Sequence, residues 1–483
     1  MAKDFIVAIE LGSSKITGMA GKKNPDGSIT ILAAASEDST SYIRKGVVYS
    51  IDKTTQGLSN IISKLKNSLQ ADITQVYVGI GGQSIHSVKN MVIKDLPMDA
   101  IVSQNMVNEL MDSNRNMTYP DYEIQDAITE EYKVDLQYQN DPVGIQASRL
   151  EGNFLNILWR RSFYRNLNKS FDNAGIAIAE TYLAPLVMAD NVLTEAEKRA
   201  GCVLVDLGAE TTTVSVYYRD KLRSIAVIPL GGDNITKDLE SLQMEACEAE
   251  RMKLKYSSAI TDVADIDPTA ILPIDSNRSV ESRRFIEVVE ARTLEIIENV
   301  KSFIPSEYID KLLGGIIITG GGSNMTNIEK AFREITGVEK IRIAKFVTLN
   351  INSKDSKPEL RHDGTMNTIL SLIARGDMNC AGNPFSNSLF DNQQFNAAFT
   401  TGTTNGTTTT QPNATTPHET EEERTKREEK ERIAKEEAER IKQEEETRKA
   451  KEEEERKKNS PIHRFFGSLK QFGRSLVEPE NNE

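Results

Sequence analysis

Apolar and polar residues form two kinds of pattern over residues 4–383. Short apolar runs of strand length, as at 6–9 and 203–205, are followed by glycine or small polar residues. Longer stretches, such as 282–303, carry apolar residues at helical spacing. Strands alternating with helices predict an α/β fold. In 282–303 the stripe expected to face the core consists of Phe285, Val288, Val289, Leu294 and Ile297.

The pattern ends near residue 384. Residues 384–418 are rich in Asn, Thr, Gly and Gln and lack the apolar residues needed to form a core, so we expect a disordered linker. A glycosylated Thr/Pro-rich stalk is the alternative, but the opening residues MAKDFIVAIELG do not resemble a signal peptide.

Residues 419–458 are almost all Glu, Lys or Arg. Opposite charges recur four residues apart, as at Glu431 and Lys435, which predicts a solvated single helix that acts as a spacer. A coiled coil is the alternative, but its apolar stripe would be confined to Ile433, Ala434, Ala438 and Ile441.

Residues 460–477 form a separate amphipathic segment. Its apolar residues recur at helical spacing with basic residues between them, a pattern typical of a helix that lies in a membrane interface. A helix docked on the body of the protein or in a partner's groove are the alternatives. The residues are Ile462, Arg464, Phe465, Phe466, Leu469, Lys470, Phe472, Arg474 and Leu476.

The overall composition narrows the function. The chain has 483 residues, with 59 Lys and Arg against 72 Asp and Glu, and the net charge of −13 disfavours nucleic-acid binding. Its three cysteines are far apart in sequence, so neither a disulfide framework nor a zinc site is expected. No apolar run approaches the length of a membrane span.

Two segments share one signature. FIVAIELGSSKITGMA (5–20) and CVLVDLGAETTTVSVY (202–217) both read as strand, acid, Leu, Gly, small polar residues and a second strand. Such a turn directs backbone N–H groups inward and can hold phosphate oxygens, while the acid before the glycine can hold magnesium through water. One copy would be an ordinary hairpin. Two copies in corresponding halves indicate a duplicated phosphate site.

Two glycine clusters complete the pattern. LLGGIIITGGGSNM (312–325) predicts a buried strand, a glycine turn that permits close approach of a ligand, and a helix. VYVGIGGQS (76–84) resembles a dinucleotide turn, but the IHSVKNMVI that follows reads as a strand, so that interpretation fails.

The order of these motifs is similar to that of the actin/Hsp70/sugar-kinase superfamily, and further segments resemble the FtsA family of bacterial cell division proteins. These are GGDNIT at 231–236, AERMKLKY at 249–256, VVEARTLE at 288–295, QVYVGIGGQSIHSVKN and the amphipathic terminus. The resemblance covers about residues 4–383 and the last twenty. The linker and the charged spacer are longer than the family generally has.

The resemblance implies an actin-like fold with two RNase H-like lobes around a nucleotide. It places residues 1–83 and 166–200 in the first lobe, and an inserted family-specific subdomain at 84–165. Residues 201–230 and 309–383 would form the second lobe, with a smaller partner-binding subdomain at 231–308.

The resemblance also implies bound ATP and Mg²⁺. Magnesium would be held by Glu10 and Asp206, through water. The nucleotide would contact Gly12, Ser13, Ser14 and Lys15, then Asp206, Gly208, Ala209, Glu210, Thr211 and Thr212, then Glu250 and Lys253, and finally Gly320, Gly321, Gly322 and Met325.

Three departures from the family pattern favour binding over hydrolysis. Glu10 replaces the usual Asp and would displace a magnesium-bound water, and GAET replaces GGGT, so that a positive φ at Ala209 or Glu210 would be strained. Ala184 precedes Pro185 where polar residues are common, and no residue there is an obvious base. We expect a slow ATPase at most.

The implied partners are the C-terminal peptide of FtsZ, other copies of the chain in actin-like filaments, anionic lipid and other division proteins. The implied location is peripheral, on the cytoplasmic face of the cell membrane at the division septum, where the protein would anchor the FtsZ ring. Arg283, Arg284 and Arg292 are the candidate peptide contacts; the alternative is that they pair with Glu287 or Glu295 at the surface. A small-molecule kinase, an Hsp70-like chaperone and an actin-like assembly protein outside division remain alternative functions.

Overall fold

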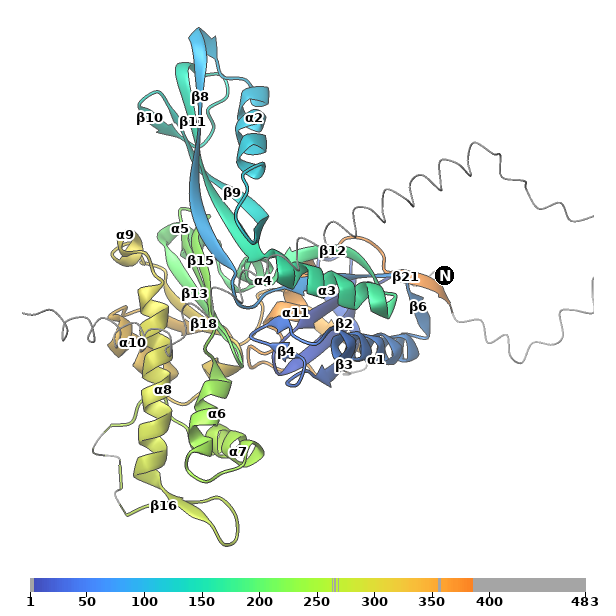
Figure 1. The fold of residues 1–483 in the computed structure, drawn as a ribbon, viewed down its shortest axis with the longest axis vertical. Coiled ribbons are helices and arrows are strands. Elements are labelled where there is room, and N and C mark those ends of the chain that lie inside the picture. Colours follow the sequence, from blue (N-terminus) through green and yellow to red (C-terminus); the bar gives the residue numbers. More distant parts are fainter. Residues whose placement is uncertain (1–3, 263, 265, 268, 355–357, 385–483) are drawn as a thin grey trace, which may run out of the picture. The chain divides into compact units, whose positions relative to one another are not determined.

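The computed structural model describes residues 4–384, apart from 263, 265, 268 and 355–357 (Figure 1). The expectations for the linker, the charged spacer and the amphipathic segment concern residues outside this part of the chain. No helix of the described residues is long and apolar enough to cross a membrane.

The first lobe contains a six-stranded sheet with the order β12-β7-β1-β2-β3-β20. Strands β1, β2 and β3 form an antiparallel meander, and β7 pairs parallel to β1. The strands are β1 (Ile6–Leu11), β2 (Lys15–Lys23), β3 (Ile29–Asp38), β7 (Gln75–Ile80), β12 (Ala177–Leu183) and β20 (Ile351–Ser353). Shorter pairs are β4 (Ile43–Arg44) with β5 (Val47–Val48), and β6 (Ala71–Ile73) with β21 (Ala381–Pro384).

Four helices pack on this lobe. In α1 the buried residues include Leu58, Ile61, Ile62, Leu65 and Leu69, a spacing of three and four that places them on one side of the helix. The helices are α1 (Ile51–Leu69), α3 (Arg161–Ala174), α4 (Ala184–Val192) and α11 (Asn367–Arg375).

The second lobe repeats the strand arrangement of the first. Strands β15-β14-β13-β18-β19 have the same order as β3-β2-β1-β7-β12, with an antiparallel meander followed by parallel strands. This repeat confirms that the duplicated signature marks two equivalent halves. The elements are α5 (Glu195–Ala200), β13 (Cys202–Leu207), β14 (Thr212–Tyr218), β15 (Lys221–Ile228), α9 (Ser306–Ile309), β18 (Gly315–Thr319), the 3₁₀ helix η2 (Gly321–Asn324), α10 (Ile328–Thr336) and β19 (Ile341–Ile343).

The smaller subdomain of the second lobe is built around α8. Phe285 and Val289 are buried as expected, but Leu294 is 42% exposed, because Thr293, Ile296 and Ile297 form the buried stripe at that level. The elements are α6 (Gly232–Glu240), α7 (Ala246–Tyr256), β16 (Ile271–Pro273), β17 (Ser279–Glu281) and α8 (Ser282–Ser302).

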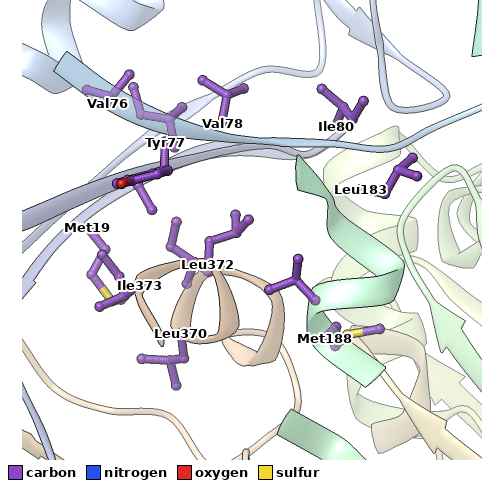
Figure 2. Packing of buried hydrophobic residues seen from close by; sticks show 14 of the residues in the cluster. Met19, Val76, Tyr77, Val78, Ile80, Leu183, Met188, Leu370, Leu372 and Ile373 are labelled. Atoms are coloured by element: carbon purple, nitrogen blue, oxygen red, sulfur yellow. The ribbon is translucent and has the colours of Figure 1, made fainter. Parts of the chain in front are cut away.

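The last described segment returns to the first lobe, contrary to the prediction that 309–383 belongs to the second. Strand β20 pairs with β3, β21 pairs with β6, and α11 packs against β1, β2 and β7. Figure 2 shows Leu372 and Ile373 of α11 on the side of the helix that faces Tyr77, and Leu370 on the opposite side. A Cβ on Gly79 would lie 2.6 Å from Leu372 Cδ1, so the glycine permits this close packing of helix on strand.

The inserted subdomain lies between β7 and α3 in sequence. It consists of β8 (His86–Ile101), α2 (Gln104–Arg115), β9 (Tyr122–Val134), β10 (Gln137–Gln139) and β11 (Gln146–Arg160). Its sheet joins that of the second lobe through one pair, His86 of β8 with Ala226 of β15. The predicted boundary after residue 165 falls inside α3, which packs on α1, so we propose to end the subdomain at Arg160.

Candidate functional site

The first candidate phosphate turn links β1 to β2, as predicted. The Gly12 N–H donates to the Lys15 carbonyl at 3.0 Å, and a Cβ on Gly12 would lie 2.7 Å from that oxygen, so only glycine fits. The Ser39 hydroxyl donates to the Gly12 carbonyl at 2.6 Å and so ties the turn to the end of β3. Ser13 is almost buried, and its hydroxyl accepts from the Gly46 N–H at 2.8 Å.

The second turn, between β13 and β14, has the same geometry. The Gly208 N–H donates to the Thr211 carbonyl at 2.9 Å, and a Cβ on Gly208 would lie 2.8 Å from that oxygen. The concern about strain was wrong: neither Ala209 nor Glu210 is among the described non-glycine residues with positive φ. GAET therefore forms the same turn as GSSK without a backbone penalty.

The two acids lie at the ends of equivalent strands, Glu10 in β1 and Asp206 in β13. The pKa of Glu10 is raised to about 7, mainly by burial and also by the charge of Asp206, whereas Lys15 and a hydrogen bond from Thr368 oppose the rise. Burial also raises the pKa of Asp206 to about 6. Two carboxylates that are costly to ionise together favour a nearby cation.

The third glycine segment packs directly against the second hairpin. Gly320 has φ of 83°, and a Cβ there would lie 2.3 Å from Asp206 Oδ1, so this position requires glycine. A Cβ on Gly322 would lie 2.8 Å from the Leu207 Cβ. The Asn324 amide donates to the carbonyls of Gly321 and Asp363 and so joins the segment to the loop before α11.

The GGDNIT segment connects the second turn to α7. Its Gly232 N–H donates to the Gly208 carbonyl at 3.0 Å, and the Asp233 N–H donates to the Ala209 carbonyl at 2.7 Å. On the other side, Lys253 of α7 donates to the Gly232 carbonyl at 3.0 Å.

Lys253 and Glu250 form one polar cluster with Thr236. Lys253 Nζ lies 2.8 Å from Thr236 Oγ1 and 2.6 Å from Glu250 Oε2, and the Thr236 hydroxyl donates to Glu250 at 2.5 Å. These two predicted nucleotide residues are therefore one contact away from the second turn. Nearby, burial raises the pKa of Asp233, opposed by Lys253 and reinforced by Glu250 and Glu210.

The structure thus links most of the predicted residues into one region. Met325 differs from the other predicted residues, because its contacts are with apolar residues of the second lobe and its smaller subdomain. Its sulfur also accepts a hydrogen bond from Thr293 of α8 at 3.7 Å. The Glu210 carboxylate accepts from the Lys45 N–H at 2.6 Å and lies 3.5 Å from Lys237 Nζ, so its charge has two partners.

Sequence reasoning missed several residues that complete this region. They are Ser39, Lys45, Gly46, Asp233, the 363–365 loop and Thr368. The dipeptide Asp363-Gly364 is a turn signal that could have drawn attention to the loop. Lys45-Gly46 carries no such distinctive signal, because its role depends on contacts with distant segments.

The candidate partner arginines are arranged differently from one another. Arg292 binds Asp238 of α6 through two nitrogens, at 2.6 and 3.0 Å, and also contacts Glu295. Arg283 pairs with Glu287 at 2.9 Å; this pair and that of Arg292 with Glu295 are those of the alternative interpretation. Arg284 is exposed. The predicted membrane residues, from Ile462 to Leu476, lie outside the described part of the chain.

Comparisons with known proteins agree with this architecture. Residues 203–361 match the family model "Cell division protein FtsA", and residues 82–158 match "SHS2 domain inserted in FTSA". Over 352 residues the chain is 32% identical to the cell division protein FtsA of Porphyromonas gingivalis, covering 71% of this chain and 74% of that one. The chain belongs to the FtsA family. Its role is therefore in cell division.

Other relatives extend the comparison. FtsA of Neisseria meningitidis is 29% identical, with 71% of this chain and 88% of the relative covered. Among solved structures, the PilM–PilN type IV pilus biogenesis complex matches with a TM-score of 0.53 at 14% identity, over 77% of this chain and 98% of that chain. The similarity to the PilM–PilN complex concerns the fold alone. With the repeated strand order of the two lobes, it agrees with the actin-like fold of the FtsA family.

Proposed function

We propose that this FtsA-family chain is a membrane-tethered, ATP-binding scaffold that anchors and organises FtsZ at the division septum. The observation that carries the nucleotide part is the pairing of two glycine turns, each preceded by an acid with a raised pKa. Such turns present N–H groups to phosphate oxygens, and the glycines of 320–322 permit close approach of the nucleotide.

The residues also fit magnesium. Glu10 and Asp206 would hold the ion, most simply through water, and the ion would screen the phosphate charge. In the described residues no three His, Cys, Asp or Glu side chains gather as metal ligands, so phosphate and water would supply the other ligands. The positive charge of Lys15 lowers the pKa of both Glu10 and Asp363, so this charge lies near both carboxyl groups.

Hydrolysis is proposed to be slow. The first turn of α4 consists of Ala184, Pro185, Leu186 and Val187, and none of these side chains can accept a proton from water. Glu10 is engaged with Thr368 and is longer than the usual Asp. We therefore expect a turnover below the ordinary enzyme range of about 1–10³ per second.

The smaller subdomain is proposed to bind the acidic C-terminal peptide of FtsZ. Arg292 projects from α8 at 25% side-chain exposure and already holds a carboxylate in a bidentate arrangement. A peptide carboxylate would use the same recognition chemistry, by joining or displacing Asp238. Arg283 and Arg284 on the same helix would add positive charge.

The amphipathic segment 460–477 is proposed to attach the protein peripherally to the cytoplasmic face of the cell membrane. Its Phe residues would enter the interface while Arg464, Lys470 and Arg474 contact anionic lipid. Self-association into actin-like filaments and recruitment of further division proteins complete the proposal.

Liposome co-sedimentation of the full chain with FtsZ tests this function. FtsZ should sediment with anionic vesicles only when the chain is present, and neutral vesicles should retain less of both proteins. If the chain sediments but FtsZ stays in solution, the anchoring role is contradicted. If neither sediments, the tethering role fails.

A further inference from the structure

A short turn between β4 and β5 contacts both candidate phosphate turns. The N–H of Lys45 donates to Glu210 of the second turn at 2.6 Å, and the next N–H, of Gly46, donates to the Ser13 hydroxyl of the first turn at 2.8 Å. Two successive backbone N–H groups therefore bind side chains from opposite lobes.

The same turn holds the entry to the inserted subdomain. The Lys45 carbonyl accepts from the Gln83 N–H at 2.8 Å. Gly46 and Gly82 have φ of 73° and 92°, and a Cβ on Gly46 would lie 2.5 Å from the Gly82 Cα. No side chain fits between these two backbones, so a displacement of one must move the other.

The exit from the subdomain is attached to the same point. Trp159, at the end of β11, is buried at 1% exposure, and its indole N–H donates to the Gln83 carbonyl at 3.3 Å. The adjacent Arg160 N–H donates to the Ser84 hydroxyl at 3.3 Å. Both chain crossings into the inserted subdomain thus meet beside the Lys45–Gly46 turn.

The inserted subdomain is also attached to the second lobe. Besides the pair of His86 with Ala226, the Ser87 hydroxyl accepts from the Ile225 N–H at 3.0 Å. Arg223 and Glu130 form a buried ion pair at 3.4 Å between β15 and β9. A change in the relation between the two phosphate turns would therefore act on the subdomain through both attachments.

We infer that the Lys45–Gly46 turn transmits occupancy of the nucleotide site to the inserted subdomain. This inference rests on the proposed binding of ATP. The Ser13 hydroxyl and the Glu210 carboxylate lie in turns that would surround phosphate. The hydroxyl has one proton to donate, and donating it to a phosphate oxygen would set the orientation of the Ser13 side chain. A phosphate that reorients Ser13 or shifts Glu210 changes the acceptors available to Lys45 and Gly46, and the change passes through Gly82 and Gln83 to Trp159.

The chain offers a direct probe, because Trp159 is its only tryptophan. The emission spectrum of the full chain is recorded with and without saturating Mg–ATP, and occupancy is measured separately by equilibrium dialysis of ATP. The wild type should show a change in Trp159 emission that follows occupancy. Glu210→Ala, compared at equal occupancy, should show a clearly smaller change, because Lys45 loses its acceptor while Gly46 keeps its contact with Ser13.

Two matched variants separate coupling from general damage. Glu210→Gln keeps an oxygen acceptor for the Lys45 N–H and should retain the emission change. Lys237→Ala removes the other partner of Glu210, at 3.5 Å, but leaves the bond to Lys45, and should also retain it. Hydrogen exchange of β8 and β11 provides a second readout and should respond to ATP in the same variants.

The outcomes are distinguishable. Equal occupancy with an unchanged emission response in Glu210→Ala overturns the relay, as does an occupied wild type in which neither Trp159 emission nor exchange responds. If the wild type binds no ATP, the proposed nucleotide function fails and the relay fails with it. Should Glu210→Ala not fold, loss of the response in folded Lys237→Ala, or in folded Glu210→Gln, overturns the relay.

Discussion

Glu10 and Asp206 come from opposite lobes, yet the charge of Asp206 contributes to raising the pKa of Glu10 to about 7. Their strands occupy equivalent positions in two sheets of the same order. The duplicated acid–glycine signature therefore produces one shared electrostatic site, and we expect the ionisation of its acids to affect the stability of the fold.

The pair predicts a specific pH dependence of stability. The pKa of Glu10 rises from 4.5 to about 7 on folding, so the folded chain binds more protons than the unfolded chain in this window, and ionisation destabilises it as the pH increases. Glu10→Gln should therefore melt at a higher temperature than the wild type above pH 7. Near pH 4.5 the difference should disappear. Melting curves in buffers without magnesium or nucleotide test this, and a pH-independent difference would contradict it.

A buried ion pair should support the junction between the inserted subdomain and the second lobe. Arg223 and Glu130 are 9% and 7% exposed, so Glu130→Ala leaves an uncompensated buried guanidinium and should destabilise by about 3–5 kcal/mol. Lys89 and Glu307 form a half-exposed pair at the same junction, and Glu307→Ala should cost less than about 1 kcal/mol. Urea titrations followed by Trp159 emission compare them; equal losses would show that burial of the pair is unimportant.

Arg292 connects partner binding to the packing of α6 on α8. Arg292→Glu should weaken binding of the FtsZ C-terminal peptide at least tenfold, about 1.4 kcal/mol. Arg292→Lys should restore it only in part, because an ammonium cannot bind a carboxylate in the bidentate manner.

Asp238→Asn is the control for that experiment. It breaks the ion pair with Arg292 but keeps the guanidinium, so it should preserve or strengthen peptide binding. Peptide titrations at low and moderate salt, with melting curves of each variant, give the comparison. If Asp238→Asn weakens binding as much as Arg292→Glu, then Arg292 acts through packing and does not contact the peptide.

Membrane attachment should depend on the Phe side chains of the terminal segment. Replacing Phe466 and Phe472 with Glu puts charge on the apolar side of the predicted helix and should abolish co-sedimentation with anionic vesicles. Gln471 does not belong to the apolar stripe of the predicted helix, so replacing it with Glu should have little effect. Unchanged sedimentation of the double variant would rule out this attachment.

Local patterns predicted much of the fold. The acid–Leu–Gly signature predicted both hairpins, and the strand pattern after VYVGIGGQS correctly argued against a dinucleotide turn, since His86–Ile101 is strand β8. The helical spacing of 282–303 likewise corresponds to α8. These elements depend on the alternation of residues within one segment.

Long-range pairing could not be predicted in the same way. The return of β20 and α11 to the first lobe depends on which sheet edge and which apolar surface remain available after the lobes form. The pairing of His86 with Ala226 and the role of Lys45–Gly46 are also invisible in local sequence, because each is defined by a backbone contact with a distant segment.

ATP binding to the full chain tests the central claim most directly. Equilibrium dialysis with and without magnesium should show saturable ATP binding that requires magnesium, and Asp206→Ala should weaken it at least tenfold, about 1.4 kcal/mol. Asp190→Ala, which removes an exposed acid paired with Lys198, should leave the affinity unchanged. Absence of saturable binding, or equal affinity of the wild type and Asp206→Ala, would contradict a nucleotide site between the two glycine turns.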